Sequence, residues 1–278
     1  MAVTYARVDP AQLYHVSRDG LDGGLSRALV HLNYPIALVG VTLVLVALGA
    51  LPRRASWVGG TAIVLCAVVA WPGVVDRNDL DARWVNALPA LGVAGALALT
   101  LAAASRTGAG FAPRRRGDPA RIAVAAVLAA LSLPWLAAQL GFHLPGDVFT
   151  GEEPYRELDG MLLASVHLGE HHGFHGALLL LTALLASRVR PPGARLRAGL
   201  LAWTAALAGY GAVNFVEDLW LEQVVKRGWT EWRIPSAVEP RVEPVWLAVL
   251  AVAGLVWLLL RAEDSPALRA GPAEAPPR

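Results

Sequence analysis

Charged residues and cysteine are scarce in this chain. The shortage of charge argues against a soluble domain, and the shortage of cysteine limits the possible disulfides and metal sites. Asp, Glu, Lys and Arg make up 17% of the 278 residues, whereas a soluble domain carries about 25%. The single cysteine, Cys66, excludes an intrachain disulfide and any cysteine-based metal site. We expect no cleavable signal, because three Arg and three Asp precede the first long apolar run, which begins only at Tyr34.

The chain contains long runs of apolar residues. The chain is 55% hydrophobic, with a mean hydropathy of +0.47. A helix needs about 20 residues to cross the hydrocarbon core of a bilayer. Seven stretches come near that length, at 34–51, 57–75, 86–104, 121–141, 168–187, 198–217 and 244–260. Such segments must be helical, because lipid offers the backbone no hydrogen-bond partner.

These runs predict an all-α fold, a polytopic integral membrane bundle of seven transmembrane helices. The transmembrane domain covers residues 34–261. The preceding residues, 1–33, form an extracytoplasmic segment with an interfacial helix from about Pro10 to Leu32. The tail, 262–278, is rich in Pro, Ala and Glu, a composition typical of disorder.

Arginine is concentrated in alternate connections between the predicted spans. Four segments on one side hold 14 of the 24 basic residues and four of the 22 acidic residues, namely 52–56, 105–121, 188–197 and 261–278. The positive-inside rule places this side in the cytoplasm. The N-terminus is then outside and the C-terminus inside, in the plasma membrane, which is the inner membrane of a bacterial cell. The net charge of +2 reflects this partition, and we expect no nucleic-acid partner.

All seven histidines map to the outer side, and four lie in the string HLGEHHGFH at 167–175. His167, His171 and His175 follow one another at i, i+4 and i+8 of a helix, close to one face. The i, i+4 spacing lets two imidazoles bind one metal ion, so His171 pairs with His175 or with His167. The glycines in and beside this string permit a neighbouring helix to approach closely; they are Gly169, Gly173 and Gly176.

Carboxylates come to the same depth from two other spans. Asn214, Glu217 and Asp218 share a face at the outer end of the sixth span, which makes this span the best donor of a third ligand. Asp76 and Asp79 share a face where the second span ends. Further candidates are His31, His143 and His172.

Two histidines and one carboxylate suit Zn²⁺ or non-haem Fe²⁺ with open coordination positions, and copper is a third candidate. The sequence therefore predicts a divalent metal in the outer leaflet. Glu170 is the predicted general base or the partner of a ligand. The ligands are drawn from His167, His171, His175, Glu217 and Asp218. The string differs from the HExxH pattern of zincins, because no Glu directly follows the first His of an i, i+4 pair.

A plainer interpretation exists for each of these features. The histidine string is also typical of a polar helix start at the membrane interface. Glu217 and Asp218 are also typical of a solvated helix end. Asp76, Asp79 and Asp81 are typical of a charged loop with arginine partners, and Asn86 of a hydrogen bond between helices.

Three functions stay open on this sequence. The first is a metal-dependent enzyme that acts on a lipid or another hydrophobic substrate through a metal-activated water or oxygen. The second is a proton or metal transporter, although the inner halves of the spans are almost purely apolar. The third is a non-catalytic subunit or assembly factor that binds partner membrane proteins through its acidic outer loops. Membrane lipid is a partner in all three.

Overall fold

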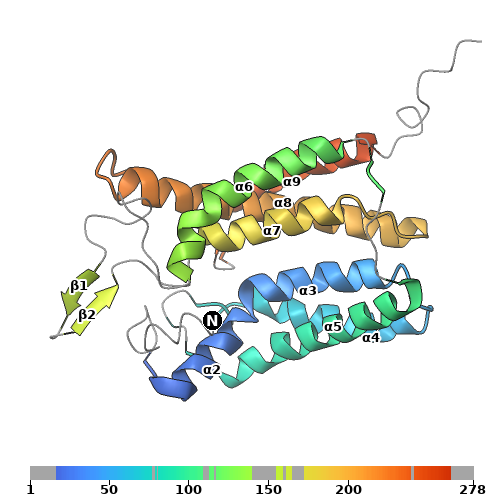
Figure 1. Cartoon of the computed structure of the whole chain (residues 1–278), viewed down its shortest axis with the longest axis horizontal. Coiled ribbons are helices and arrows are strands. Elements are labelled where there is room, and N and C mark those ends of the chain that lie inside the picture. The colour runs from blue at the N-terminus through green and yellow to red at the C-terminus, as the bar shows by residue number, and fades with distance from the viewer. Residues whose placement is uncertain are drawn as a thin grey trace, which may run out of the picture.

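The structure, a computed structural model, describes residues 17–76, 79, 81–108, 113–115, 117–139, 155–158, 161–164, 172–238 and 241–263. Its α-helices are α2 (Gly20–His31), α3 (Tyr34–Ala47), α4 (Ala55–Ala67), α5 (Ala87–Thr107), α6 (Asp118–Gln139), α7 (His172–Ala186), α8 (Ala194–Trp220) and α9 (Val245–Glu263). A short antiparallel hairpin pairs β1 (Tyr155–Leu158) with β2 (Met161–Ala164) (Figure 1).

Helices lie at all seven predicted span positions, as α3 to α9 in order. Four helices are long and apolar enough to cross a membrane by themselves, at Trp84–Thr107, Asp118–Ala137, Ala194–Val225 and Val245–Glu263. Helices α2 and α3, bent by 46° at their junction, make a fifth if they are counted as one span. The apolar helices Ala55–Ala70 and His172–Ala186 are shorter. The described part is therefore a helical protein of membrane type, and the count of seven spans stays a prediction.

Local sequence signals set several helix ends. Pro35 lies in the first turn of α3, where its missing N–H leaves no hydrogen bond unmade. Helix α4 tightens into the 3₁₀ turn η2 (Val68–Ala70) and stops before Pro72 and Gly73, the latter at φ +80°. The predicted second span therefore ends early. Asp76 and Asp79 lie on an irregular connection, so their placement on one helix face was wrong.

Two groups of helices make up the bundle (Figure 1). One group is α2 to α5 and the other is α6 to α9, and α3 joins them because it contacts both α7 and α8. The indole Nε1–H of Trp203 on α8 donates a hydrogen bond to Thr42 Oγ1 on α3 at 2.9 Å. The junction of the two groups is thus held by a specific polar contact as well as by apolar packing.

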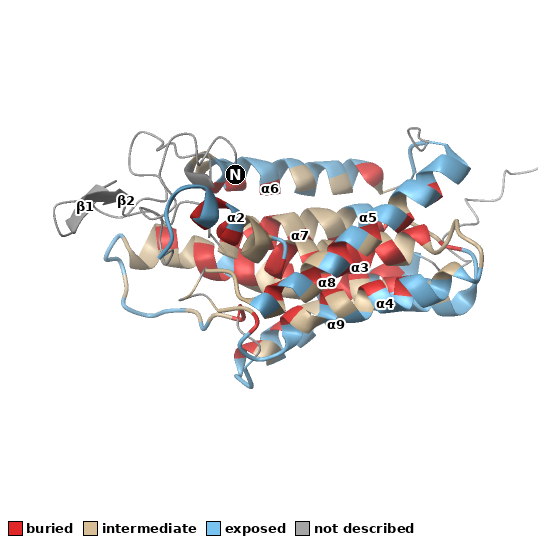
Figure 2. Cartoon of the chain, turned by 90° about the horizontal axis from the view of Figure 1, so that it is seen from below, coloured by how far each residue is buried: buried red, intermediate tan, exposed pale blue. Residues whose placement is uncertain are grey.

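The outward faces of the helices expose large apolar side chains. Figure 2 shows exposed residues along the outer faces, while the buried residues lie on the parts of the helices that face the interior of the bundle. Leu101 on α5 is 70% exposed and Leu247 on α9 is also 70% exposed. A surface this apolar is typical of contact with a membrane or another apolar partner.

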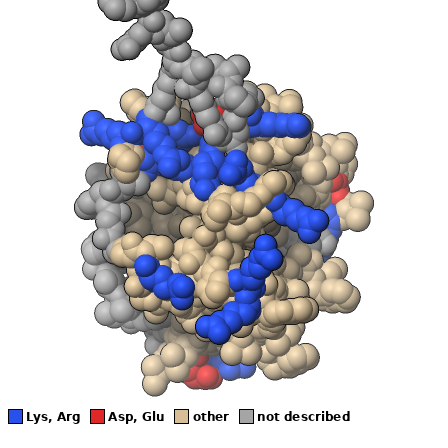
Figure 3. All heavy atoms as spheres, turned by 90° about the vertical axis from the view of Figure 1, so that its right-hand side faces the viewer, with Lys and Arg blue, Asp and Glu red and all other residues tan. Residues whose placement is uncertain are grey.

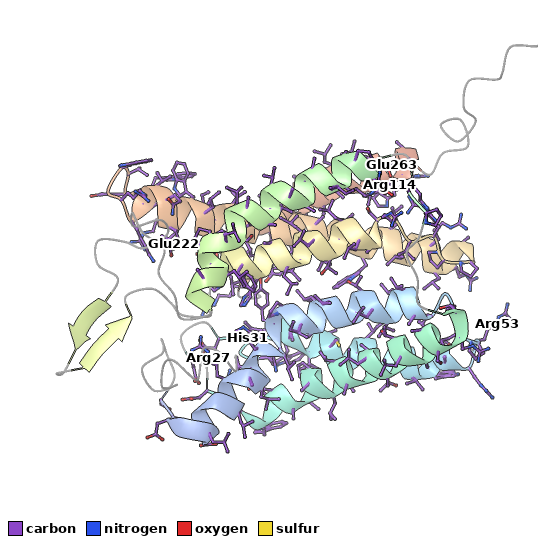
Figure 4. All side chains as sticks on the ribbon, in the orientation of Figure 1. Arg27, His31, Arg53, Arg114, Glu222 and Glu263 are labelled. Atoms are coloured by element: carbon purple, nitrogen blue, oxygen red, sulfur yellow. The ribbon has the colours of Figure 1, made fainter. Side chains whose placement is uncertain are left out.

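Basic residues gather at one end of the bundle, called here the arginine end (Figure 3). Arg53 and Arg114 lie at this end, and Arg27 and His31 lie at the opposite one, called the histidine end (Figure 4). The sorting of arginine to one side, predicted from the sequence, is thus visible in the fold. Which side is cytoplasmic stays a prediction.

Ion pairs tie three helix ends together at the arginine end. Asp118 at the start of α6 lies 2.8 Å from Arg188, which follows α7. Arg121 lies 2.6 Å from Glu263 at the end of α9 and donates from Nε to Ser187 Oγ at 2.9 Å. This network joins α6, α7 and α9.

Candidate functional site

A close contact between α7 and α8 positions the described part of the histidine string. Gly176 of α7 faces Gly211 of α8, so that a Cβ on Gly176 would lie 2.6 Å from the Gly211 carbonyl oxygen. It would also lie 2.6 Å from the backbone nitrogen of Phe215. The close approach predicted from the glycines is confirmed at Gly176, and the neighbour is the predicted sixth span.

Glu217 and Asp218 are both buried beside this contact. Asp218 Oδ2 accepts a hydrogen bond of 2.9 Å from the Gly173 N–H, in the first turn of α7, where backbone N–H groups lack helical partners. The indole of Trp135 covers Gly173, since a Cβ there would lie 2.2 Å from the ring. These carboxylates are therefore not a solvated helix end, and Asp218 orders the start of α7.

His175 lies inside the bundle with 2% of its surface exposed. Its ring makes edge contacts with His31, at a centroid distance of 5.4 Å, and with Tyr34, at 5.3 Å. Tyr34 in turn makes an edge contact with Tyr210 at 6.0 Å, and Tyr210 stacks on Trp246 at 5.6 Å. A continuous series of rings thus runs across the bundle, and a polar helix start at the interface does not describe His175.

A polar cavity of about 30 Å³ lies beside His175. Three imidazoles and three carboxylates line it, together with a guanidinium: His31, His172, His175, Asp76, Asp79, Asp81 and Arg83. A space of this size holds a water molecule or a small ion. The cavity brings together ionisable groups from the end of α2, the connection after α4 and the start of α7.

Two asparagines in the lining of this polar cavity, Asn33 and Asn86, are hydrogen-bonded to each other. Asn86 Nδ2 donates to Asn33 Oδ1 at 2.9 Å, and Asn33 Nδ2 donates to the Asn86 carbonyl oxygen at 3.0 Å. Both side chains are 1% exposed. Asn86 also donates to the Val74 carbonyl oxygen at 3.3 Å. Asn86 thus makes the hydrogen bond between segments that the sequence predicted. It holds the bend between α2 and α3 in contact with the connection after α4.

The carboxylates of this connection have neighbours of their own. Asp81 Oδ2 accepts hydrogen bonds from the backbone N–H of Ser17, at 3.1 Å, and from the Ser17 hydroxyl. Asp79 Oδ1 accepts from the Asp81 N–H at 3.1 Å. The Ala82 N–H donates to Ser26 Oγ at 2.6 Å, which attaches the connection to α2. These hydrogen bonds fix the connection after α4 against the segment that begins α2.

The structure brings together only some of the residues that were predicted to bind a metal ion. The predicted residues His143, His167, Glu170 and His171 lie outside the described residues. Within the described ranges, no three His, Cys, Asp or Glu side chains are arranged to hold a metal ion. His175 lies next to His31 and lines the same polar cavity as Asp76 and Asp79. Asp76 and Asp79 therefore share this cavity with His175, whereas Asp218 accepts a hydrogen bond from the start of α7.

Comparison with protein-family models, with curated proteins and with solved structures gives no match. The function of the chain must therefore be argued from this geometry.

A larger apolar cavity of about 270 Å³ adjoins the polar one. It lies between α3, α8 and α9, and aromatic rings form much of its wall: Tyr34, Trp203, Tyr210 and Trp246. Tyr34, Val75 and Val238 line both cavities. A polar space and an apolar space therefore meet at the Tyr34 ring.

Several residues of this site escaped the sequence analysis. Tyr210 precedes Asn214 by one helical turn and Glu217 by two, so the polar face of the sixth span extended further than predicted. Tyr34 lies three residues after His31, at the start of the first apolar run. That position beside a candidate histidine was the signal from which Tyr34 could have been predicted as a site residue. Arg27 and Glu222 are buried charges at the histidine end. Nothing in the sequence indicated that these two charged residues are buried, because each resembles an ordinary exposed polar residue of its segment.

Proposed function

We propose that the chain is an integral membrane enzyme that acts on the polar group of an amphiphilic substrate at the histidine end. The observation that carries this proposal is the junction of the two cavities at Tyr34. Ligand sites are mostly apolar clefts with a few convergent polar groups, and this pair of cavities has that composition. The substrate's apolar part lies in the larger cavity, and its polar group reaches the histidines and carboxylates.

The side chains of the polar cavity suit proton transfer. Imidazole exchanges protons near neutral pH, and carboxylates within reach of it orient the ring and accept a proton. His175 is the proposed acid–base group, because it lies between His31 and Tyr34 and also lines the cavity. His31 and Asp76, which line the same cavity, are the proposed partners.

A divalent metal is a further part of the proposal, and the donor set supports it. Imidazole and carboxylate together suit Zn²⁺ and Fe²⁺. With a metal bound, His175 would be a ligand, joined by His171 one turn before it in the sequence, and the acid–base role would pass to Glu170, as the sequence predicts. Elemental analysis of the purified protein tests this part. Stoichiometric metal that is lost in the His171→Ala/His175→Ala double variant is expected, and metal retained in full by that variant would contradict it.

The enzyme proposal itself is tested on lipids. The full chain is reconstituted in nanodiscs made from a total membrane lipid extract, and the lipid profile is followed by mass spectrometry. A species should be consumed by the wild-type protein and spared by His175→Gln. The matched control is Arg53→Gln, an exposed change at the arginine end, which should behave as wild type. An unchanged lipid profile with the folded wild-type protein argues against catalysis on membrane lipids.

A further inference from the structure

We propose that the arginine end holds the head group of an anionic membrane phospholipid, in a crevice between α8, the end of α9 and the connection after α7. The site lies at the opposite end of the bundle from the proposed catalytic cavities. It therefore depends on the membrane character of the bundle and on no reaction at the histidine end. Three observations carry it: an excess of positive charge, a crevice that is both basic and apolar, and the buried hydroxyl of Thr204.

Positive charge at the arginine end far exceeds negative charge. The four sequence segments on that side hold 14 basic and four acidic residues. Two of the acids, Asp118 and Glu263, are already ion-paired, at 2.8 Å from Arg188 and at 2.6 Å from Arg121. Figure 3 shows basic side chains spread over this end, with uncharged surface between them. Such an excess attracts the anionic lipids of the adjoining leaflet.

One crevice at this end combines guanidinium groups with an apolar wall. Arg190, after α7, and Arg197, in the first turn of α8, both line it. Arg190 donates hydrogen bonds to the carbonyl oxygens of Ser187 and Val189, which hold its side chain against the end of α7. The apolar part of the wall comes from α8 and α9 and includes Leu200, Leu201 and Leu260. Basic pockets between membrane helices are typical sites for phospholipid head groups.

Thr204 supplies an independent indication of a ligand in the same crevice. The residue lines the crevice and is 2% exposed. Its hydroxyl oxygen has no hydrogen-bond partner among the described residues. Other threonines of the spans donate to the carbonyl oxygen four residues earlier, as do Thr42, Thr100 and Thr182. Because buried polar atoms are nearly always hydrogen-bonded, an acceptor from outside the described chain is expected at Thr204.

The depth of the crevice matches the polar part of a phospholipid. Arg197 is exposed, whereas Thr204 is buried seven residues further along α8, which is about 10 Å of helix. The head-group region of a bilayer is about 5–8 Å deep on each side, so Thr204 lies near the level at which the acyl chains begin. The ester carbonyls of a phospholipid lie below its phosphate. One of them can accept from Thr204 while the phosphate contacts Arg197.

The size of the crevice decides which part of the lipid enters it. Its enclosed volume is about 10 Å³, near the minimum that holds one water-sized group. It therefore has room for one ester carbonyl and none for a whole head group, which lies outside against the exposed Arg197. A free phosphate would contact the arginines and leave the Thr204 hydroxyl without an acceptor, so the geometry favours the lipid.

The test compares head groups on identical acyl chains. The full chain, purified in a mild detergent, is titrated with phosphatidylglycerol or with phosphatidylcholine, and bound lipid is counted by native mass spectrometry. We expect phosphatidylglycerol to bind roughly fivefold more tightly, the factor that one arginine near an anionic surface contributes. Inorganic phosphate is added as a soluble competitor and should leave the bound phosphatidylglycerol in place.

Matched variants separate a defined site from general attraction to arginine. Arg197→Gln should weaken phosphatidylglycerol binding roughly fivefold. The control, Arg195→Gln, removes the same charge from an exposed position of the same helix, outside the described lining of the crevice, and should bind as wild type does.

Thr204→Val keeps the shape of the side chain and removes its hydroxyl. It should weaken binding roughly threefold, as expected for one hydrogen bond, and Thr204→Ser should restore it. The thermal midpoint of Thr204→Val in lipid-free detergent should not fall, because the hydroxyl bonds to no described residue.

A preference for phosphatidylglycerol that depends on Arg197 and Thr204, and not on Arg195, supports the proposed lipid site. Equal losses in Arg195→Gln and Arg197→Gln would overturn it, because the attraction would then belong to the whole arginine end. Displacement of the lipid by inorganic phosphate at a similar concentration would also overturn it and identify a site for free phosphate. Unchanged lipid binding in Thr204→Val would exclude the crevice as the place of the ester group and overturn the site as proposed.

Discussion

The close contact of α7 with α8 predicts that Gly176→Ala is strongly destabilising although alanine is the better helix former. The added Cβ would lie 2.6 Å from the Gly211 carbonyl oxygen, 2.6 Å from the Phe215 nitrogen and 3.0 Å from its Cα. All three are backbone atoms in the middle of α8, so no side chain can turn aside to make room. The two helices must move apart.

The size of the effect follows from that movement. Relieving the overlap requires a separation of roughly 0.5–1 Å, and a gap of that size forfeits a quarter to a half of the dispersion energy of each facing atom pair. Overpacked positions lose about 1–3 kcal/mol, and packing is the main force between helices in lipid. Since Asp218 of α8 holds the first turn of α7, the same separation should also loosen the position of His175.

The loss of stability is measured by following the folded fraction of the protein as the SDS concentration rises, in mixed micelles with a mild detergent. The matched control is Gly199→Ala on the partner helix α8, where a Cβ meets nothing within 4 Å. That control should be neutral or stabilising by up to about 1 kcal/mol, as expected for Gly→Ala in an open helical position. Equal stability of Gly176→Ala and Gly199→Ala would refute the close-packed α7–α8 contact.

Three further predictions concern polar contacts. Asn86→Ala should lower the free energy of unfolding by about 1–3 kcal/mol, because it leaves the buried Asn33 Oδ1 without its donor; chemical denaturation measures this, and a neutral result would contradict the amide pair. Thr42→Val should lower it by about 0.5–1 kcal/mol through loss of the bond from Trp203, and Thr42→Ser, which keeps the acceptor, should restore most of that loss. Asp118→Asn should lower the thermal midpoint in detergent by weakening its pairs with Arg188 and Arg121, an effect that should fade in high salt if the pairs are screened.

The sequence predicted the helices better than their ends. Hydropathy is summed over a window of about 20 residues, so each apolar run was found, and helices α3 to α9 lie at those positions. Helix ends depend on single residues and on neighbours distant in sequence. Pro72 and Gly73 end the second apolar helix early, and the consequence is functional, because Asp76 and Asp79 then lie on a connection that lines a cavity.

Some of the burial at the histidine end was predicted from the sequence, and the contacts made there were not. His175, Glu217 and Asp218 were expected at one depth, and the structure buries all three at the histidine end. The bond from Gly173 to Asp218 was beyond prediction, because it depends on how closely α7 and α8 approach. The predicted residues His167, Glu170 and His171 lie outside the described residues, so the metal they were expected to hold stays a prediction.

The sequence by itself determined what kind of protein this is, and the tertiary structure decided what meets at its site. Membrane character and the sorting of arginine to one end follow from local composition, which is already present in the unfolded chain. The neighbourhood of His175 and His31 exists only because α2 bends into α3 and the Asn33–Asn86 pair holds that bend. The junction of a polar and an apolar cavity at Tyr34 depends on segments that are far apart in the sequence, and packing alone brings them together.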